Sequence, residues 1–352
     1  MIRTWTSSTV DASPQFSAMY VFGDSLVDHG NNNYLASLAK ANYLPYGIDF
    51  VEGPTGRFCN GKTIIDFLGE LVGLPIIPAF ISTLSDEGSI RHGVNYASAA
   101  GGIRDDSGRQ LGDRFSLYQQ VQHFQRTLNQ MKNQMGDEEI RRHLAKSLVV
   151  MNLGNNDYLN NYLLPSFYNT SSIYKPLEYA EILISTYTTR IMDLHKLGMR
   201  KFVIAAVGPL GCMPNQLAAG EAAPGTCVKV VNEIVGLFNV RLRTLIDRLN
   251  NMRLTRDTIF VYGNAYDVFY DIFHNSNKYG LAIVDRGCCG SGRYQGEITC
   301  LPLQIPCVDR DEYMFWDAYH PTELVNKIFA ERAYAGSPAD CYPINVKKMA
   351  RL

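Results

Sequence analysis

The chain has 352 residues, 46% hydrophobic and 19% charged, and 33 Lys and Arg nearly balance 34 Asp and Glu for a formal net charge of -1. This globular composition excludes a disordered or collagen-like chain, and the absence of a basic excess argues against nucleic-acid binding. No apolar run approaches the roughly 18 residues that a transmembrane helix needs, so we expect no membrane span.

The N-terminal residues 1–17 are polar and rich in Ser and Thr, and they lack the apolar stretch of a signal peptide. We expect these residues to form a flexible extension, followed by a single domain over residues 18–352. Either a signal peptide has been trimmed or the protein is intracellular, and the cysteines discussed below favour trimming.

Short apolar segments alternate with helical patterns along the rest of the chain. Continuous apolar runs are typical of strands buried on both faces, as in a parallel sheet. The runs are 18–22, 93–97, 147–153, 201–207 and 258–262. Patterns with a helical period occupy 119–131, 176–197, 228–252 and 322–333. This alternation predicts a doubly wound α/β sheet with right-handed crossovers.

Polar motifs follow several of these runs, where loops at the carboxyl ends of parallel strands carry binding and catalytic residues. A last motif lies before the final helix. Together they supply a serine, a glycine-rich turn, a side-chain amide, and a carboxylate three residues before a histidine. The motifs are Gly23-Asp24-Ser25-Leu26, Ser98-Ala99-Ala100-Gly101-Gly102, Gly154-Asn155-Asn156-Asp157 and Asp317-Ala318-Tyr319-His320-Pro321.

These are the parts of an acyl-transfer site. A serine hydroxyl needs an adjacent base, so Ser25 is the candidate nucleophile, and His320 can take its proton while Asp317 orients the imidazole. The resulting oxyanion needs preorganised donors, for which we expect the backbone N–H groups of Ser25 and Gly102 and the amide of Asn156. The remaining histidines are expected to be surface or packing residues: His29, His92, His123, His143, His195 and His274.

Eight cysteines, an even number in Gly- and Pro-rich stretches, indicate disulfides and an oxidising compartment. No pair has the C-x-x-C spacing of a zinc site. We expect Cys212 and Cys227 to close one loop, and Cys300 and Cys307 to bond to the adjacent Cys288-Cys289; free buried cysteines are the alternative. Asn169-Thr170-Ser171 is a glycosylation sequon in a segment with loop composition.

The motifs resemble those of the GDSL-type SGNH hydrolases, and in detail those of the plant GDSL esterase/lipases. The resemblance extends from about Met19 to Cys341 in the order of the family's blocks. Beyond the motifs given above it rests on Gly30-Asn31-Asn32, Pro54-Thr55-Gly56-Arg57-Phe58, Gly93-Val94-Asn95-Tyr96-Ala97, Gly208-Pro209-Leu210-Gly211-Cys212 and Tyr313-Met314-Phe315-Trp316.

The resemblance implies a flavodoxin-like three-layer α/β/α sandwich with a parallel sheet of about five strands. It implies Ser25 as nucleophile, His320 as base oriented by Asp317, and Gly102 and Asn156 as oxyanion donors. Because Ala99-Ala100 replace residues that are often glycine in the family, Gly101 is an alternative donor to Gly102. The family uses neither a metal nor an organic cofactor, and its plant members are mostly secreted.

The favoured function is therefore hydrolysis of carboxylic esters through an acyl-enzyme, with small-molecule, lipid or cell-wall esters as candidate substrates. The alternative is an acyltransferase in which an alcohol intercepts the same acyl-enzyme, because the catalytic residues do not separate the two outcomes. A non-catalytic binding protein on this scaffold is disfavoured by the intact set of Ser25, Asn156, Asp317 and His320.

Overall fold

A six-stranded sheet in the order β2-β1-β3-β4-β5-β8 forms the centre of the protein, which is seen in a computed structural model that describes residues 13–84, 87–220, 222–223 and 225–352. The first five strands in this order are parallel, and the short β8 pairs antiparallel with β5 at one edge. The strands are β1 (Met19–Gly23), β2 (Gly93–Asn95), β3 (Leu148–Asn152), β4 (Lys201–Ala205), β5 (Ile259–Gly263) and β8 (Cys341–Tyr342). The parallel order 2-1-3-4-5 is flavodoxin-like, which confirms the predicted fold class.

Helices cover both faces of this sheet. The longer ones are α1 (Ile64–Val72), α3 (Leu117–Lys132), α4 (Asp137–Ala145), α7 (Pro176–Lys196), α9 (Lys229–Asn251), α10 (Ala265–His274) and α11 (Glu323–Ala335). The short ones are α2 (Phe80–Thr83), α5 (Asn155–Asp157), α6 (Thr170–Ile173), α8 (Pro214–Ala219) and α12 (Val346–Met349). A separate pair of parallel strands, β6 (Ile283–Gly287) and β7 (Tyr313–Phe315), lies beyond the main sheet.

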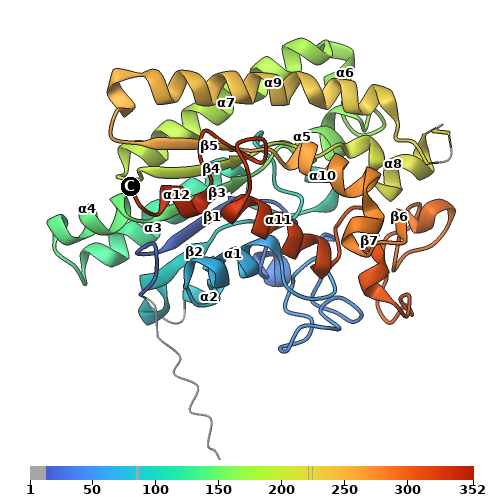
Figure 1. The fold of residues 1–352 in the computed structure, drawn as a ribbon, viewed down its shortest axis with the longest axis horizontal. Helices are drawn as coiled ribbons and strands as arrows, with labels where there is room; N and C mark the ends of the chain where they lie inside the picture. Colours follow the sequence, from blue (N-terminus) through green and yellow to red (C-terminus); the bar gives the residue numbers. More distant parts are fainter. Residues whose placement is uncertain (1–12, 85–86, 221, 224) are drawn as a thin grey trace, which may run out of the picture.

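The strands bury alternate side chains in two cores. Tyr20 and Phe22 of β1 belong to the larger core, which includes residues of α3, α7 and α9. Met19 and Val21 of the same strand belong to a second core with residues of α1, α11 and α12. Figure 1 shows the resulting three layers, with α7 and α9 above the sheet and α1 and α11 below it. Because both faces are covered, the parallel strands are mainly apolar, as the sequence indicated.

All five predicted parallel strands are present, and the four predicted helices correspond to α3, α7, α9 and α11. Gly198, just after α7, has a φ of 113°, a left-handed conformation that favours glycine at a helix end. The sequence did not predict β6, which carries Asp285 and Arg286, because a half-exposed strand with charges lacks the apolar run that marked the others.

The N-terminal extension expected over residues 1–17 joins the domain earlier than predicted. Residues 1–12 lie outside the described residues. Phe16 is only 2% exposed and belongs to the second core. The backbone N–H of Gln15 donates to Val72 O at 2.9 Å, and that of Ser17 donates to Lys146 O at 3.2 Å. Residues 15–17 are therefore part of the packed domain, which corrects the expected boundary at residue 18.

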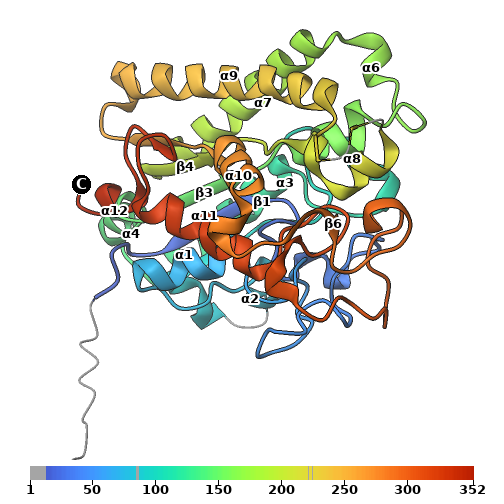
Figure 2. The same cartoon turned by 45° about the vertical axis from the view of Figure 1, so that its right-hand side comes forward.

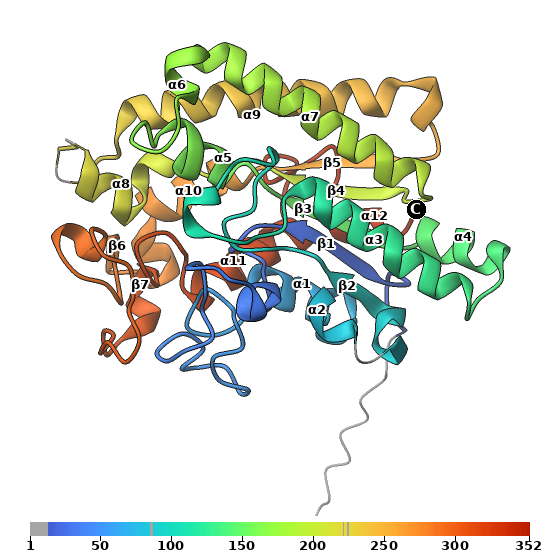
Figure 3. The ribbon, with the colours of Figure 1, turned by 180° about the vertical axis from the view of Figure 1, so that it is seen from behind.

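Two irregular segments from opposite ends of the chain lie side by side at the carboxyl edge of the sheet. Figures 1 and 3 show the blue segment that follows β1 next to the orange-red segment around β6 and β7, and the intermediate view of Figure 2 agrees. The hydroxyl of Tyr43 donates to Cys300 O at 3.0 Å, and Asp49 pairs with Arg310 at 2.6 Å. These contacts bring the regions containing Ser25 and His320 together.

Disulfides close one loop after β4 and the long loop between β6 and β7. Cys212 bonds to Cys227, Cys288 to Cys307, and Cys289 to Cys300. All three agree with the expected pairing of these residues. Cys59 and Cys341 are buried free thiols. Within the described ranges, no helix has both the length and the apolarity to cross a membrane.

Candidate active site

Ser25, His320 and Asp317 form one continuous chain of hydrogen bonds. Ser25 lies just after β1, and its Oγ is 2.8 Å from Nε2 of His320, a residue 295 positions further along the chain. The other ring nitrogen, Nδ1, lies 2.8 Å from Oδ2 and 2.9 Å from Oδ1 of Asp317. With Nδ1–H donating to the carboxylate, Nε2 is the acceptor that faces the serine hydroxyl.

The Asp317 carboxylate is completely buried and well supplied with donors. Oδ1 accepts the backbone N–H groups of Tyr319 and His320, both at 2.8 Å, and Oδ2 accepts the Tyr46 hydroxyl at 2.5 Å. Burial favours the neutral acid, but the adjacent His320 and these hydrogen bonds hold the pKa of Asp317 below its ordinary value. The residue is therefore an anion that can stabilise an imidazolium.

The side-chain amide of Asn156, in the short α5 after β3, has a fixed orientation. Its Nδ2 donates to Gly101 O at 3.0 Å, and its Oδ1 accepts Nδ2 of Asn160 at 2.6 Å. Asn160 in turn accepts Nε2 of Gln110 at 2.8 Å. Because an amide oxygen must face the Asn160 donor, the NH2 end of Asn156 is directed away from it.

Gly101 and Gly102, the predicted backbone donors, lie in a closely packed turn. The N–H of Gly101 already donates to Ser98 O at 3.0 Å. A Cβ on Gly102 would lie 2.7 Å from Ser107 Cβ and 2.8 Å from Asp157 Oδ1, so close packing explains the glycine. Neither glycine is among the described residues that line the cavity beside Ser25.

Ala100 lies in the same turn and does line that cavity. Its φ is 64°, a left-handed conformation that is uncommon for a residue with a side chain. Among the described residues its N–H has no acceptor, and the same holds for the N–H of Ser25. Unused donors therefore accompany Ser25 on two sides.

Asp157 fixes the segment after this turn, since its buried carboxylate accepts Ile103 N at 2.8 Å, Arg104 N at 3.0 Å and Ser107 Oγ at 2.8 Å. Asp24, beside the serine, is held in the same way. Its Oδ2 accepts Asn155 Nδ2 at 2.8 Å, and burial raises the pKa of Asp24 to about 6. Asn155 and Asp157, on either side of Asn156, thus hold the turns that contain Asp24 and residues 103–107.

The cavity at this edge has a volume of about 210 Å³ and includes Ser25, Asn156 and His320 in its wall. Most of the remaining wall is apolar or aromatic, with the single cation Lys40 among the described lining residues. The apolar wall includes Leu38, Tyr43, Phe58, Leu111, Leu159 and Met213. An apolar group next to the serine would be removed from water in this space.

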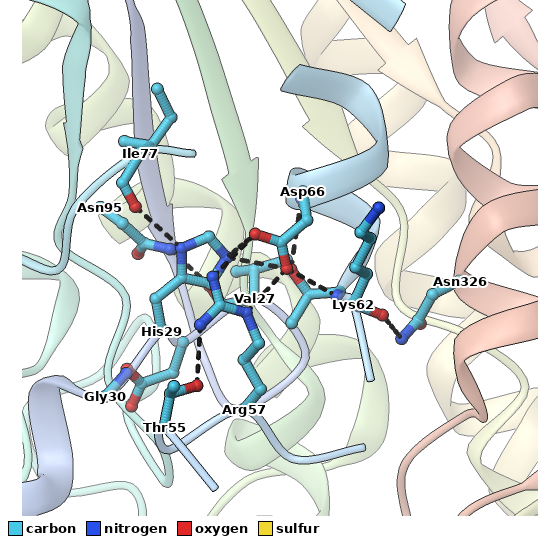
Figure 4. A network of polar contacts seen from close by, with 12 residues as sticks. Val27, His29, Gly30, Thr55, Arg57, Lys62, Asp66, Ile77, Asn95 and Asn326 are labelled. Atoms are coloured by element: carbon cyan, nitrogen blue, oxygen red, sulfur yellow. Dashed lines mark hydrogen bonds and ion pairs between the residues drawn. The ribbon is translucent and has the colours of Figure 1, made fainter. Parts of the chain in front are cut away.

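Phe58 connects the site to a buried polar network. Its ring centroid is 5.0 Å from that of His320. The preceding Arg57 makes two 2.8 Å hydrogen bonds to Asp66 of α1, and Figure 4 shows this pair beside His29. Burial and the Arg57 charge lower the pKa of His29 to about 4, so the ring is neutral near pH 7. The expected packing role of His29 agrees with its position.

Asn169 lies apart from this site and is exposed, directly before α6. Tyr46, Gln110 and Asn160 are the contributors that sequence reasoning missed. Tyr46 and Gln110 contact partners that are remote in sequence, so no spacing marks them. Asn160 lies four residues after Asn156, a helical spacing that could have indicated the contact. In the described part of the chain, no group of three or more His, Cys, Asp or Glu side chains is arranged to hold a metal ion.

A parallel 2-1-3-4-5 sheet with a hydrogen-bonded serine, histidine and aspartate at its carboxyl edge has the architecture of the SGNH hydrolases. The chain belongs to the GDSL-like lipase/acylhydrolase family, whose sequence profile matches residues 19–333. This family consists of hydrolases that act on ester bonds.

Similar proteins from Arabidopsis thaliana support this assignment. GDSL esterase/lipase At5g08460 is 57% identical over 97% of the chain and 89% of its own length. GDSL esterase/lipase At1g71250 is 49% identical over 97% of the chain and 91% of its own length. GDSL esterase/lipase 7 is 47% identical over 97% of the chain and 94% of its own length.

Proposed function

We propose that the protein hydrolyses carboxylic esters through an acyl-enzyme on Ser25. The observation that supports this most directly is the 2.8 Å separation of Ser25 Oγ and His320 Nε2, with Asp317 on the other side of the ring. This is the arrangement that nucleophilic catalysis by serine requires. Membership of the family supports the reaction class.

In the first half-reaction, Ser25 Oγ attacks the ester carbonyl carbon and its proton passes to His320 Nε2. The carbonyl π electrons move to the oxygen, which becomes an oxyanion. When the tetrahedral intermediate collapses, the C–O bond to the alcohol breaks and His320 returns the proton to the departing oxygen. Asp317 remains ionised throughout and stabilises the imidazolium.

We assign the oxyanion donors to the N–H of Ser25, the N–H of Ala100 and Nδ2 of Asn156. Ala100 replaces the predicted Gly102 and its alternative Gly101 in this role. Ala100 lines the cavity with an unused N–H, whereas the N–H of Gly101 donates to Ser98 O and Gly102 is not among the described lining residues. Three converging donors stabilise charge that develops only in the transition state.

In the second half-reaction, His320 takes a proton from water, whose oxygen attacks the acyl carbon. Collapse of the second intermediate breaks the bond to Ser25 Oγ, which recovers its proton from His320 and releases the acid. An alcohol in place of water would give acyl transfer from the same intermediate. The apolar wall of the cavity favours esters with an apolar acyl or alcohol group.

We also propose that the protein is exported and carries a glycan on Asn169. Three disulfides are stable in an oxidising compartment. The exposure of Asn169 makes the sequon accessible.

The deciding experiment compares the wild-type protein with Ser25→Ala, using hydrolysis of a short-chain aryl ester and labelling by a fluorophosphonate. We expect turnover and a labelled Ser25 peptide in the wild type, and neither in Ser25→Ala, with the same circular dichroism spectrum. Ser185→Ala is a suitable control because Ser185 is an exposed residue of α7 that does not line the cavity. Turnover by Ser25→Ala at the wild-type rate would refute the assignment of Ser25 as the nucleophile. Adding alcohols and measuring acylated alcohol against free acid distinguishes hydrolysis from transfer.

A further inference from the structure

Tyr46 reaches the carboxylate of Asp317 from a loop 271 positions away in sequence. The separation of its hydroxyl oxygen from Oδ2 is 2.5 Å. Tyr46 is 2% exposed and Asp317 is fully buried, so water does not compete for this contact. A hydrogen bond to an ionised acceptor in such surroundings is stronger than a neutral one.

The other donors to Asp317 come from the short loop that contains it. They are the backbone N–H groups of Tyr319 and His320 and the ring Nδ1 of His320. Among the described residues, Tyr46 is the donor that reaches the carboxylate from outside residues 317–320. Its hydroxyl is therefore an independent influence on the charge that Asp317 presents to His320.

Aromatic neighbours fix the Tyr46 ring. Its centroid is 5.3 Å from that of Tyr43, 5.9 Å from Phe58 and 6.2 Å from Trp316, all in edge-on arrangements. Burial and the Asp317 charge raise the pKa of Tyr46 well above its ordinary value. The phenol consequently remains a protonated donor across the pH range in which an esterase is assayed.

We propose that Tyr46 is a positioning residue that sets, through Asp317, the lower pH limit of activity; this rests on the function proposed above. The phenol draws negative charge toward its own proton and away from the imidazole. Without this hydrogen bond, Asp317 would stabilise an imidazolium more strongly, or would itself bind a proton more readily. Either change leaves less of the active form at low pH, so both move the acidic limit upward.

Other ionisable groups face His320 and Asp317 and contribute to the observed profile. Asp24 acts on His320 through its charge, and Tyr43 and Tyr319 sense the charge of Asp317. Lys40 contributes to the cavity wall. The measured midpoint belongs to this coupled set. A comparison of variants that retain these groups isolates the effect of the Tyr46 hydroxyl.

The test is the pH dependence of kcat/KM for Tyr46→Phe, with Tyr34→Phe as a matched control. Tyr34 lies in the same segment after β1, but it is 83% exposed and does not line the cavity. We expect the acidic midpoint to rise by about one pH unit in Tyr46→Phe, from the strength of a hydrogen bond to a charged group. Tyr34→Phe should leave the midpoint unchanged. A Tyr46→Phe midpoint at or below the wild-type value would overturn the proposal.

Replacement of Tyr46 by 3-fluorotyrosine gives a second readout that preserves the packing. The fluorinated phenol is a stronger donor, so the acidic midpoint should move to lower pH. If Tyr46→Phe does not fold, the 3-fluorotyrosine protein provides the test. An acidic midpoint equal to that of the wild type would then contradict the proposal. Fluorophosphonate labelling of Ser25 in the wild type separates the two hypotheses. Active, labelled enzyme with an unmoved midpoint refutes only the role of Tyr46.

Discussion

The side-chain amide of Asn160 donates to the amide oxygen of Asn156 at 2.6 Å, and Asn160 itself accepts from Gln110. Each amide in this series therefore fixes the orientation of the next. In the last one, Asn156, one hydrogen of the NH2 group donates to Gly101 O and the other remains for the proposed oxyanion contact. A residue that need not contact the substrate thus determines which end of Asn156 faces the cavity.

The first prediction compares Asn160→Asp with Asn160→Ala. A carboxylate at position 160 cannot donate and instead attracts the NH2 group of Asn156, which reverses the amide. We expect kcat for Asn160→Asp to approach that of Asn156→Ala, a loss of roughly 10²–10³-fold for one oxyanion donor. Asn160→Ala should lose less, because it removes the constraint without reversing it. Steady-state kinetics with an aryl ester provide the measurement, and equal losses in the two Asn160 variants would contradict this account.

The second prediction concerns Asp24 and the pH dependence of stability. Burial raises its pKa from 3.8 to about 6 in the folded protein. Asp24 therefore contributes most to stability below about pH 4, and this contribution is lost as the pH rises through 6. At 1.36 kcal/mol per pKa unit, the change amounts to about 3 kcal/mol. Urea unfolding should show that the free energy of unfolding of Asp24→Asn rises relative to that of the wild type between pH 4 and pH 7. If the unfolding free energies of the two proteins changed in parallel with pH, the result would be inconsistent with a raised pKa of Asp24. Asp113→Asn, at an exposed position, serves as the control.

The third prediction concerns the buried pair of Arg57 and Asp66. Asp66→Asn leaves the guanidinium buried without its counter-charge, which typically costs about 3–5 kcal/mol of unfolding free energy. Glu70→Gln on the same helix α1 removes an exposed partner of Lys62 and should cost below about 1 kcal/mol. Both are measured by denaturant unfolding at pH 7. Arg57 and its neighbours hold the pKa of Asp66 below its ordinary value despite burial, so the penalty for Asp66→Asn should shrink as the pH falls below about 4. A penalty no larger than that of Glu70→Gln would show that the pair adds little.

The sequence was sufficient for the five parallel strands, for α3, α7, α9 and α11, and for the motif that contains Ser25, because each is marked by a local pattern. The first four residues of β3 are apolar, and α9 carries a continuous apolar stripe. The residues Ser25, Asn156 and His320 follow strands or precede a helix in short motifs, so topology brings them to one edge.

Residues that act through distant contacts could not be found in this way. Tyr46 and Asp317 meet only because irregular loops from the two ends of the chain pack together. Gln110 and Asn160 are polar residues of two short helical segments, 50 positions apart, whose amides are aligned only by the fold. The proposed donor Ala100 could not be inferred from the sequence, because no glycine marks its left-handed conformation.

The separation of Ser25 and His320 in the sequence has a consequence for biosynthesis. On the proposed function, the nucleophile leaves the ribosome early, whereas its proton acceptor is made near the end of synthesis. Until the final loops dock, the nascent polypeptide would then have a serine without this base and would not cleave the esters around it. Competence would thus be acquired in one late step, which timed release from a cell-free translation reaction could follow.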